Sequence, residues 1–308
     1  MSLNLRQLEV VRAICRFGSA TGAAEALGVT QPAISMMLRE ANRAAGIPLF
    51  VRRHGRLQPT AETTVLVADL DRVLGGIERI NRLVAEMKDA RVGTIQVAAQ
   101  PTLAENLVTR AVAVFQSQRP NVRIAIHAMD NREVVASVVH EQVDLGLVLS
   151  PTRHVETRCT DLCAGALVCV VHPDSPLAAR KTVTARDLAP YPLISFSRTL
   201  PLGQLIEEWF SAAGLPRRIA VEVYTSSLAC AMVRARGGVA IVDPFWLLGH
   251  QGRDLCYIPL YPQTMVTAQI LTPKSASLSR PARIFLRTLA EDSQAAMSRL
   301  GRGSRGRG

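Results

Sequence analysis

The sequence predicts an α/β protein in three parts: a small helical head, a long connecting helix and a larger α/β domain. Residues 1–60 combine helical periodicity with a tight glycine turn and a short basic hairpin pattern. Residues 61–90 carry one unbroken helical pattern, and strand-like and helix-like segments then alternate over residues 91–298. The chain of 308 residues is long enough for two domains, and its 48% hydrophobic content is enough for sizeable cores.

The helical head is organised around residues 19–45, which hold two short helical patterns separated by Gly28, Val29 and Thr30. Gly28 can adopt the positive φ that stops the first helix, and Thr30 is a suitable N-cap for the second. The second helix has an apolar stripe formed by Ile34, Leu38, Ala41 and Ala45. Its opposite face has polar and basic groups and no acid: Pro32, Ser35, Met36, Arg39 and Arg43. This pattern is typical of a helix-turn-helix that lies against DNA, and an ordinary helical hairpin is the alternative.

A first helix and a basic hairpin flank this pair. Residues 3–17 have an apolar helical face that can pack beneath the other two helices, formed by Leu5, Leu8, Val11 and Ile14. Residues 50–60 predict a strand, a turn and a second strand, with basic side chains around Gly55: Arg52, Arg53, His54 and Arg56. A basic hairpin beside a helix-turn-helix is typical of a wing that contacts phosphates or the minor groove.

Residues 3–62 resemble the winged helix of the LysR-type transcriptional regulators. The matching positions follow in order without gaps: Ala23, Ala24, Leu27, Val29, Thr30, Gln31, Pro32, Ala33, Ile34, Ser35, Gly46, Leu49, Phe50, Arg52, Pro59 and Thr60. The sequence departs from the family at Ala41 and Asn42, where Leu-Glu is usual, and lacks the usual glycine after Ala61. The first departure bears on helix packing or on contact with the next helix. The resemblance implies a DNA-binding surface made of Gln31, Pro32, Ser35, Met36, Arg39, Arg52, Arg53 and Arg56.

The charge of the chain also favours an anionic partner. It has 36 Lys and Arg against 25 Asp and Glu, a formal net charge of +11, and part of this surplus lies in residues 299–307. Such basicity favours nucleic acid, although a membrane surface would attract it as well. No segment has the length and apolarity of a transmembrane helix, and residues 1–10 lack the layout of a signal peptide. We therefore expect a cytoplasmic, nucleoid-associated protein that binds double-stranded promoter DNA.

The long helix expected over residues 61–90 has a heptad seam. Its apolar residues alternate steps of four and three: Leu66, Leu70, Val73, Ile77, Ile80, Val84 and Met87. Such a helix cannot bury this seam on itself, so we expect a homodimer through residues 61–89 and, further, a homotetramer. Packing against its own domain is the alternative. In the family this is the linker helix that pairs the DNA-binding heads, and a dimer predicts an operator with an interrupted inverted repeat.

Alternation of strands and helices from residue 94 onward predicts parallel sheets with crossover helices. The expected strands are 94–99, 122–127, 144–149, 166–172, 193–196, 220–224, 239–242 and 267–271. Element order resembles the same family, which implies an effector domain of two lobes like those of periplasmic binding proteins, with the chain crossing between them twice. Lobe one would comprise residues 94–163 and 267–298, and lobe two residues 164–266. The tail 299–308 is expected to be disordered.

The effector domain contains no motif that points to an enzyme: no P-loop, no GxGxxG after a strand, no GxSxG and no HExxH. Its histidines are scattered without nucleophile or metal spacing, so we expect no cofactor and no metal site. Binding of a small effector is the better interpretation, because ligands of open α/β lobes lie beyond the carboxyl ends of strands, at helix N-termini. A metabolic enzyme with an added DNA-binding head is the more distant alternative.

Four loops and one turn are candidates for the effector site. Their residues are Gln100, Pro101 and Thr102; Ser150 with Thr152; Ser195, Phe196 and Ser197; Thr225 and Ser226; and Asp243. Hydroxyls and free backbone N–H groups suit a carboxylate, and Asp243 suits a ligand amine. Helix capping is the alternative for each loop, and closure of a turn before proline is the alternative for Asp243. Residues 55–62 and 242–245 most resemble the branch of the family that senses lysine-pathway amino acids and opines.

Six cysteines are scattered along the chain, without a CxxC or Cys/His metal spacing. Cys159 and Cys163 are the only close pair, and ordinary small buried residues are the simpler interpretation of both. The competing function is therefore a redox-sensing DNA-binding regulator that uses these two thiols.

Overall fold

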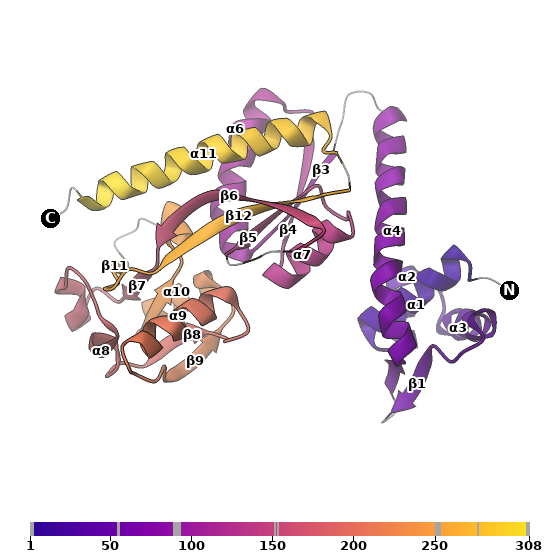
Figure 1. The fold of residues 1–308 in the computed structure, drawn as a ribbon, viewed down its shortest axis with the longest axis horizontal. Helices are drawn as coiled ribbons and strands as arrows, with labels where there is room; N and C mark the ends of the chain where they lie inside the picture. The colour runs from indigo at the N-terminus through magenta and orange to yellow at the C-terminus, as the bar shows by residue number, and fades with distance from the viewer. Residues whose placement is uncertain are drawn as a thin grey trace. The chain divides into compact units, whose positions relative to one another are not determined.

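The computed structural model describes residues 3–53, 56–88, 94–150, 152, 154–249, 254–275 and 277–305 (Figure 1). The chain divides into two compact units, Met1–Val84 with His140–Gln142, and Ala85–Val139 with Val143–Gly308. The first contains the helical head and most of the long helix, and the second contains two five-stranded sheets with their helices. These elements are those of the predicted fold class.

The head is a three-helix winged helix-turn-helix. Its elements are α1 (Leu5–Phe17), α2 (Ala20–Leu27), α3 (Gln31–Ala45), β1 (Phe50–Arg53) and β2 (Arg56–Pro59). Asn4 begins α1 with a capping box in which its side chain accepts from the Gln7 N–H. α2 ends at Gly28 with φ of 64°, which provides the tight turn into α3. Thr30 occupies the N-cap position of α3 as predicted, but its side chain makes no capping hydrogen bond.

The apolar faces of the three helices meet in one core under the wing. Ile14, Ile34 and Leu49 are fully buried there, and Leu70 of the following helix joins them. The unusual Asn42 also has a structural role in this head, because its Oδ1 accepts a hydrogen bond of 2.9 Å from the Leu49 N–H. This bond ties the end of α3 to the residue that precedes the wing.

The connecting helix is α4 (Ala61–Lys88), and its heptad seam is divided in two. Leu66 and Leu70 pack onto the core of the head. Farther along, Val73, Ile80 and Val84 are 53%, 55% and 45% exposed in the single chain. The side chain of Met87 lies outside the described part of the structure. The first part of the seam therefore attaches the helix to its own head, and the second part is an apolar surface open to another copy.

Lobe one is built on a sheet of order β4-β3-β5-β12-β6. Its strands are β3 (Thr94–Ala99), β4 (Arg123–Ala128), β5 (Leu145–Leu149), β6 (Thr157–Ala166) and β12 (Met265–Pro273). Three of them, β3, β4 and β5, are parallel, whereas β12 is antiparallel to both β5 and β6. Its helical segments are α5 (Pro101–Leu103), the π-helix η1 (Ala104–Val108), α6 (Thr109–Gln118), α7 (Asn131–Val139) and α11 (Arg280–Arg305).

Lobe two is built on a sheet of order β11-β7-β10-β8-β9. Its strands are β7 (Val168–Val171), β8 (Leu193–Phe196), β9 (Ile219–Val223), β10 (Val239–Val242) and β11 (Cys256–Pro259). The parallel strands are β8, β9 and β10, and β7 is antiparallel to its two neighbours. The helical segments are η2 (Pro176–Ala179), α8 (Ala185–Leu188), α9 (Pro201–Ala212), α10 (Ser226–Arg234) and η3 (Pro244–Leu248).

The chain passes between the lobes twice, as expected, first from β6 to β7 and then from β11 to β12. β6 and β12 lie side by side along this crossing, with α11 across them (Figure 1). The Phe115 ring on α6 meets the Phe285 ring on α11 edge to face, with centroids 5.4 Å apart. One continuous apolar core reaches from lobe one into lobe two.

Three features of the effector domain differ from the expectations. The sheets are mixed, because each crossing segment adds antiparallel strands to an otherwise parallel set. The strands β6 and β11 lie where no strand was expected. In β6, TRCTDLCAGA lacks a period-two apolar pattern, and nine-residue pairing with β12 holds it in the sheet. The tail was expected to be disordered from Arg299, but α11 continues through Arg305, because extending an existing helix costs far less than starting one.

Candidate functional site

The outer face of α3 is polar, basic and exposed. Pro32, Met36 and Arg39 are exposed, and Met36 has 51% of its surface open to solvent. Gln31 Nε2 donates to Ser35 Oγ at 2.8 Å, and Arg39 Nε donates to the Ser35 backbone oxygen at 3.3 Å. The residues predicted to read bases are thus held together around Ser35, on the side of α3 opposite buried Ile34 and Ala41.

The N-terminus of α3 is suited to a phosphate. Because Thr30 makes no side-chain cap, its hydroxyl and the first-turn N–H groups of α3 remain available to an anion, at the positive end of the helix dipole. In the wing, Arg52 is exposed on β1, opposite Leu57 of β2. His54, Gly55 and the side chains of Arg53 and Arg56 lie outside the described part of the structure.

The first effector loop follows β3. Gln100 caps α5 by accepting from the Leu103 N–H at 3.3 Å, and Pro101 occupies the first turn of this segment. Thr102 is fully buried, and its hydroxyl makes no hydrogen bond of normal geometry with any described residue. Its carbonyl accepts from Asn106 Nδ2 at 2.9 Å, at the start of the π-helix. A buried hydroxyl without a partner is rare and marks this loop as a place for a ligand atom or an ordered water.

Asp243, at the end of β10, faces the Thr102 loop across the two lobes. Its carboxylate accepts from Ser226 Oγ at 2.7 Å and from the Phe245 N–H at 3.1 Å, so it caps η3 and links α10 to β10. Complete burial raises its pKa, and the hydrogen bond from Ser226 and the proximity of the Thr102 hydroxyl partly oppose that rise. The structure therefore brings together Thr102, Ser226 and Asp243, with Asp243 in the turn-closing role that was the alternative to pairing with a ligand amine.

The predicted residues at the end of β8 differ in burial. Ser195 and Phe196 are buried within β8, and only Ser197 is partly exposed at the strand's end. Ser197 Oγ accepts from the Thr199 hydroxyl at 3.2 Å. Gly203 in the first turn of α9 has to be a glycine, since an added Cβ would lie 1.9 Å from the Ser197 carbonyl oxygen.

The side chains of the remaining predicted residues form hydrogen bonds with backbone N–H groups of the fold. Thr225 caps α10 by accepting from the Leu228 N–H at 3.2 Å. Ser150 Oγ accepts from the Thr267 N–H at 3.1 Å, which joins β5 to β12. Capping or strand pairing thus accounts for the contacts of both side chains, although both loops lie beyond the carboxyl ends of parallel strands, as predicted.

Two buried polar residues at these loops have no counterpart among the sequence predictions. Asn131, at the start of α7, donates to the Leu149 carbonyl at 2.7 Å and accepts from the Leu149 N–H at 3.2 Å. Arg217, with a fully buried side chain, donates to the Gly203 carbonyl at 2.7 Å and lies 2.7 Å from Glu207. Burial lowers the pKa of Arg217, and Glu207 partly offsets this. Asn131 could have been noticed as a polar residue directly after a strand, but no local signal marks Arg217.

The thiols of Cys159 and Cys163 are too far apart in this structure to form a disulfide with each other. Both lie on β6, four residues apart, and strand geometry separates such residues by about 13 Å, well beyond disulfide distance. Burial raises the pKa of Cys163 to about 12, which keeps it in the unreactive thiol form. Among the described residues, no group of His, Cys, Asp and Glu could hold a metal ion. None of the helices over the same ranges is long and apolar enough to cross a membrane.

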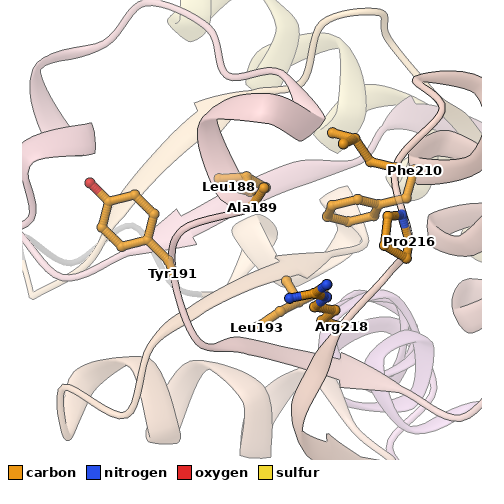
Figure 2. Close-up of a pocket in the computed structure, with 8 residues that line it drawn as sticks. Leu188, Ala189, Tyr191, Leu193, Phe210, Pro216 and Arg218 are labelled. Atoms are coloured by element: carbon orange, nitrogen blue, oxygen red, sulfur yellow. The ribbon is translucent and has the colours of Figure 1, made fainter.

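A separate pocket lies in lobe two, away from the predicted effector loops (Figure 2). It has a volume of about 170 Å³ and lies between α8, the start of β8, the end of α9 and the segment before β9. Its lining residues are Leu188, Ala189, Tyr191, Leu193, Phe210, Leu215, Pro216 and Arg218. Sequence reasoning did not find it, because the apolar lining comes from four segments that each contribute to the core.

The sequence and the fold both match known proteins. Residues 5–63 match the family described as bacterial regulatory helix-turn-helix protein, lysR family, and residues 88–294 match the LysR substrate binding domain. The transcriptional activator protein LysR of Escherichia coli K12 is 28% identical over 299 residues, covering 97% of this chain and 95% of that protein. The octopine catabolism/uptake operon regulatory protein OccR of Rhizobium meliloti is 31% identical over 246 residues, covering 79% and 80%. The crystal structure of CbnR, a LysR family transcriptional regulator, superposes with a TM-score of 0.69 at 20% identity, covering 94% of this chain and 99% of that one. The chain therefore belongs to the LysR family of bacterial transcriptional regulators, which joins a DNA-binding helix-turn-helix to an effector-binding domain.

Proposed function

We propose that this regulator binds an interrupted inverted repeat as a dimer paired through α4, and that an amino-acid-like or opine-like carboxylate between the lobes alters its contacts with DNA. In this proposal residues 1–60 bind DNA, residues 61–90 pair the subunits and residues 91–298 hold the effector. Pairs of dimers form the tetramer. The protein acts at the nucleoid, where its operators lie.

One observation carries the DNA part of the proposal. The exposed face of α3 brings Gln31, Ser35 and Arg39 into one hydrogen-bonded group beside an uncapped helix N-terminus. A side-chain amide and a guanidinium suit the edges of adenine and guanine in the major groove, and the helix end suits a phosphate. Arg52 in the wing is placed to contact the backbone.

This part is tested by selecting binding sites from random duplex DNA with the full-length protein. The expected product is two related half-sites separated by a spacer, because a two-fold dimer places one recognition helix in each half. Enrichment of a single half-site without a partner would contradict pairing through α4. Absence of any enriched sequence would contradict base reading by α3.

The effector part rests on the loops of the two lobes. Thr102 supplies a buried hydroxyl without a hydrogen-bond partner among the described residues, and Ser197 supplies a partly exposed hydroxyl at the end of β8. We assign the effector carboxylate to these two groups and their neighbouring N–H groups. Asp243 is already bonded to Ser226 and Phe245, so it supports the contact between the lobes and is not assigned to the effector amine. The similarity to OccR, a protein named for octopine catabolism and uptake, supports the amino-acid and opine class.

The assignment is tested by titrating octopine, arginine and lysine into wild type, Thr102→Val and Ser197→Ala while following the melting temperature. A ligand that binds only the folded state raises this temperature. Thr102→Val keeps the shape of the side chain and removes only the hydroxyl, so the ligand-free protein should keep its fold and its DNA affinity. Loss of one hydrogen bond to a charged group should weaken ligand binding by about ten- to a hundredfold. Equal ligand affinity in all three proteins would place the effector elsewhere, and lost DNA binding without ligand would give both residues a structural role.

A further inference from the structure

The pocket in lobe two combines an apolar floor with one cation, Arg218, that has no counter-ion among the residues that the structure describes. Leu188, Leu193 and Phe210 form the floor and are buried, with between 1% and 3% of their surfaces exposed. Arg218 is exposed at the rim, and no described residue forms a hydrogen bond or an ion pair with its guanidinium. Figure 2 shows Arg218 beside Leu193, with Phe210 and Pro216 to one side and Leu188 and Ala189 to the other. The Tyr191 hydroxyl points away from this group.

The neighbouring Arg217 differs from Arg218, because it has an acidic partner among the described residues. Arg217 and Arg218 directly precede β9, and the side chain of Arg217 is buried whereas Arg218 is exposed. Arg217 is buried and lies 2.7 Å from Glu207, and Arg198 forms a further ion pair with the same carboxylate at 3.1 Å. The acidic group on that side is therefore shared by two arginines, and Arg218 faces the pocket alone.

We propose that this pocket is a second ligand site, which binds a small apolar monocarboxylate with its carboxylate on Arg218. An exposed guanidinium offers two parallel N–H donors that match a carboxylate. The floor offers only carbon to the rest of the ligand, so a polar amino acid would lose hydration there without compensation. The ligand class differs from that proposed between the lobes, and the two sites lie at opposite ends of β8.

The size of the pocket limits the ligand. An apolar cavity of about 150 Å³ is known to hold one benzene molecule. The volume of about 170 Å³ therefore accommodates one aromatic ring or a short branched chain, with the acid group at the open rim. Phenylacetate has this shape, and phenylacetamide is its neutral counterpart of nearly equal size.

The test uses saturation-transfer NMR titrations of the full-length protein with phenylacetate and phenylacetamide. Phenylacetate should bind wild type up to about fivefold more tightly than phenylacetamide, since only the acid pairs with Arg218 and this arginine is exposed. Arg218→Gln should weaken phenylacetate binding to the level of the amide and leave amide binding unchanged. Ala189→Phe, at an exposed rim position, should fill the pocket and abolish binding of both compounds.

Two control variants test whether changes in ligand binding arise at this pocket, and not from loss of charge elsewhere or from the effector loop. Arg186→Gln removes the same charge from an exposed position on α8 that does not line the pocket, and it should leave both affinities unchanged. Ser197→Ala changes the proposed effector loop and should also leave phenylacetate binding intact. Failure of phenylacetate to bind wild type overturns the proposal. The proposal is also overturned if phenylacetate still binds both Arg218→Gln and Ala189→Phe. If Ser197→Ala abolishes phenylacetate binding, the ligand lies between the lobes instead.

Discussion

Arg39 and Arg52 carry the same charge but lie on elements that meet DNA differently. Arg39 is on the exposed face of α3 and Arg52 is on the first strand of the wing. Arg39→Ala should cost about 1–3 kcal/mol of binding free energy, concentrated at one position of the operator. Arg52→Ala should weaken binding to all sequences alike and reduce the salt dependence. Fluorescence anisotropy with single-base operator variants at several salt concentrations distinguishes the two effects. If Arg39→Ala lowered the affinity equally for all operator variants, Arg39 would not read a base.

Asp243 should give the stability of the protein a distinctive pH dependence. Burial raises its pKa in the folded state, so the folded chain holds this proton to higher pH than the unfolded chain does. The resulting stabilisation is complete below the unfolded pKa of about 4 and is lost as pH rises through the folded-state pKa. Across that window the free energy of unfolding should fall by no more than about 1.4 kcal/mol per pH unit.

The measurement is urea unfolding of wild type and Asp243→Asn over a series of pH values. The free energy of unfolding of Asp243→Asn should lack this pH-dependent contribution, because the asparagine side chain does not titrate. A hydrogen bond lost with Ser226 or the Phe245 N–H would shift its whole curve by a constant amount without changing the slope. Parallel curves for the two proteins would show that Asp243 keeps its unfolded-state pKa.

At the scale of elements, the exposed half of the α4 seam predicts subunit pairing. Ile80→Glu places a charge in the surface that a second copy would cover, and burying an unpaired charge costs several kcal/mol. Asn81→Glu adds the same charge at the next, exposed position outside the seam and serves as the control. Analytical ultracentrifugation should show weakened assembly and lower operator affinity for Ile80→Glu only. Unchanged assembly of this variant would remove the coiled-coil interpretation.

The first turn of α9 depends on a close approach between two backbones. In Gly203→Ala the new Cβ would lie 1.9 Å from the Ser197 carbonyl, so the loop after β8 must shift. Such overpacking typically costs about 1–3 kcal/mol. Gln204→Ala, an exposed neighbour on the same helix, should change stability by no more than about 0.5 kcal/mol. Chemical denaturation compares the two, and equal stability would mean that the loop accommodates a side chain freely.

At the scale of the whole molecule, net charge sets the strength of non-specific DNA binding. Deleting residues 301–308 removes three arginines and no acid, which lowers the formal net charge from +11 to +8. The apolar side chains of α11 that join the core end at Met297, so thermal stability should not change. Affinity for random duplex DNA and its salt dependence should both decrease. Unaltered non-specific binding would show that these arginines stay away from the duplex.

Membership in a family of regulators confirms the prediction that the chain is a DNA-binding regulator and not an enzyme. The motif responsible is local: the glycine turn, the stripe through Ile34 and Ala41 and the basic wing all lie within residues 19–60. Local patterns likewise predicted α4 and the parallel strands, since periodicity reflects how neighbouring residues share one face.

Accessibility of the polar residues depends on packing between distant segments. Thr102, Ser195, Ser226 and Asp243 look like loop residues in the sequence, yet all four are fully buried, because segments distant along the chain cover them. The pairing of β6 with β12 and the burial of Arg217 beside Glu207 likewise depend on contacts between distant segments. Patterns within a short stretch of sequence do not predict such contacts. Local sequence patterns therefore predicted the family, the helical head, α4 and the parallel strands, whereas the packing of distant segments determined the antiparallel strands, the pockets, the buried charges and the groups that a ligand can reach.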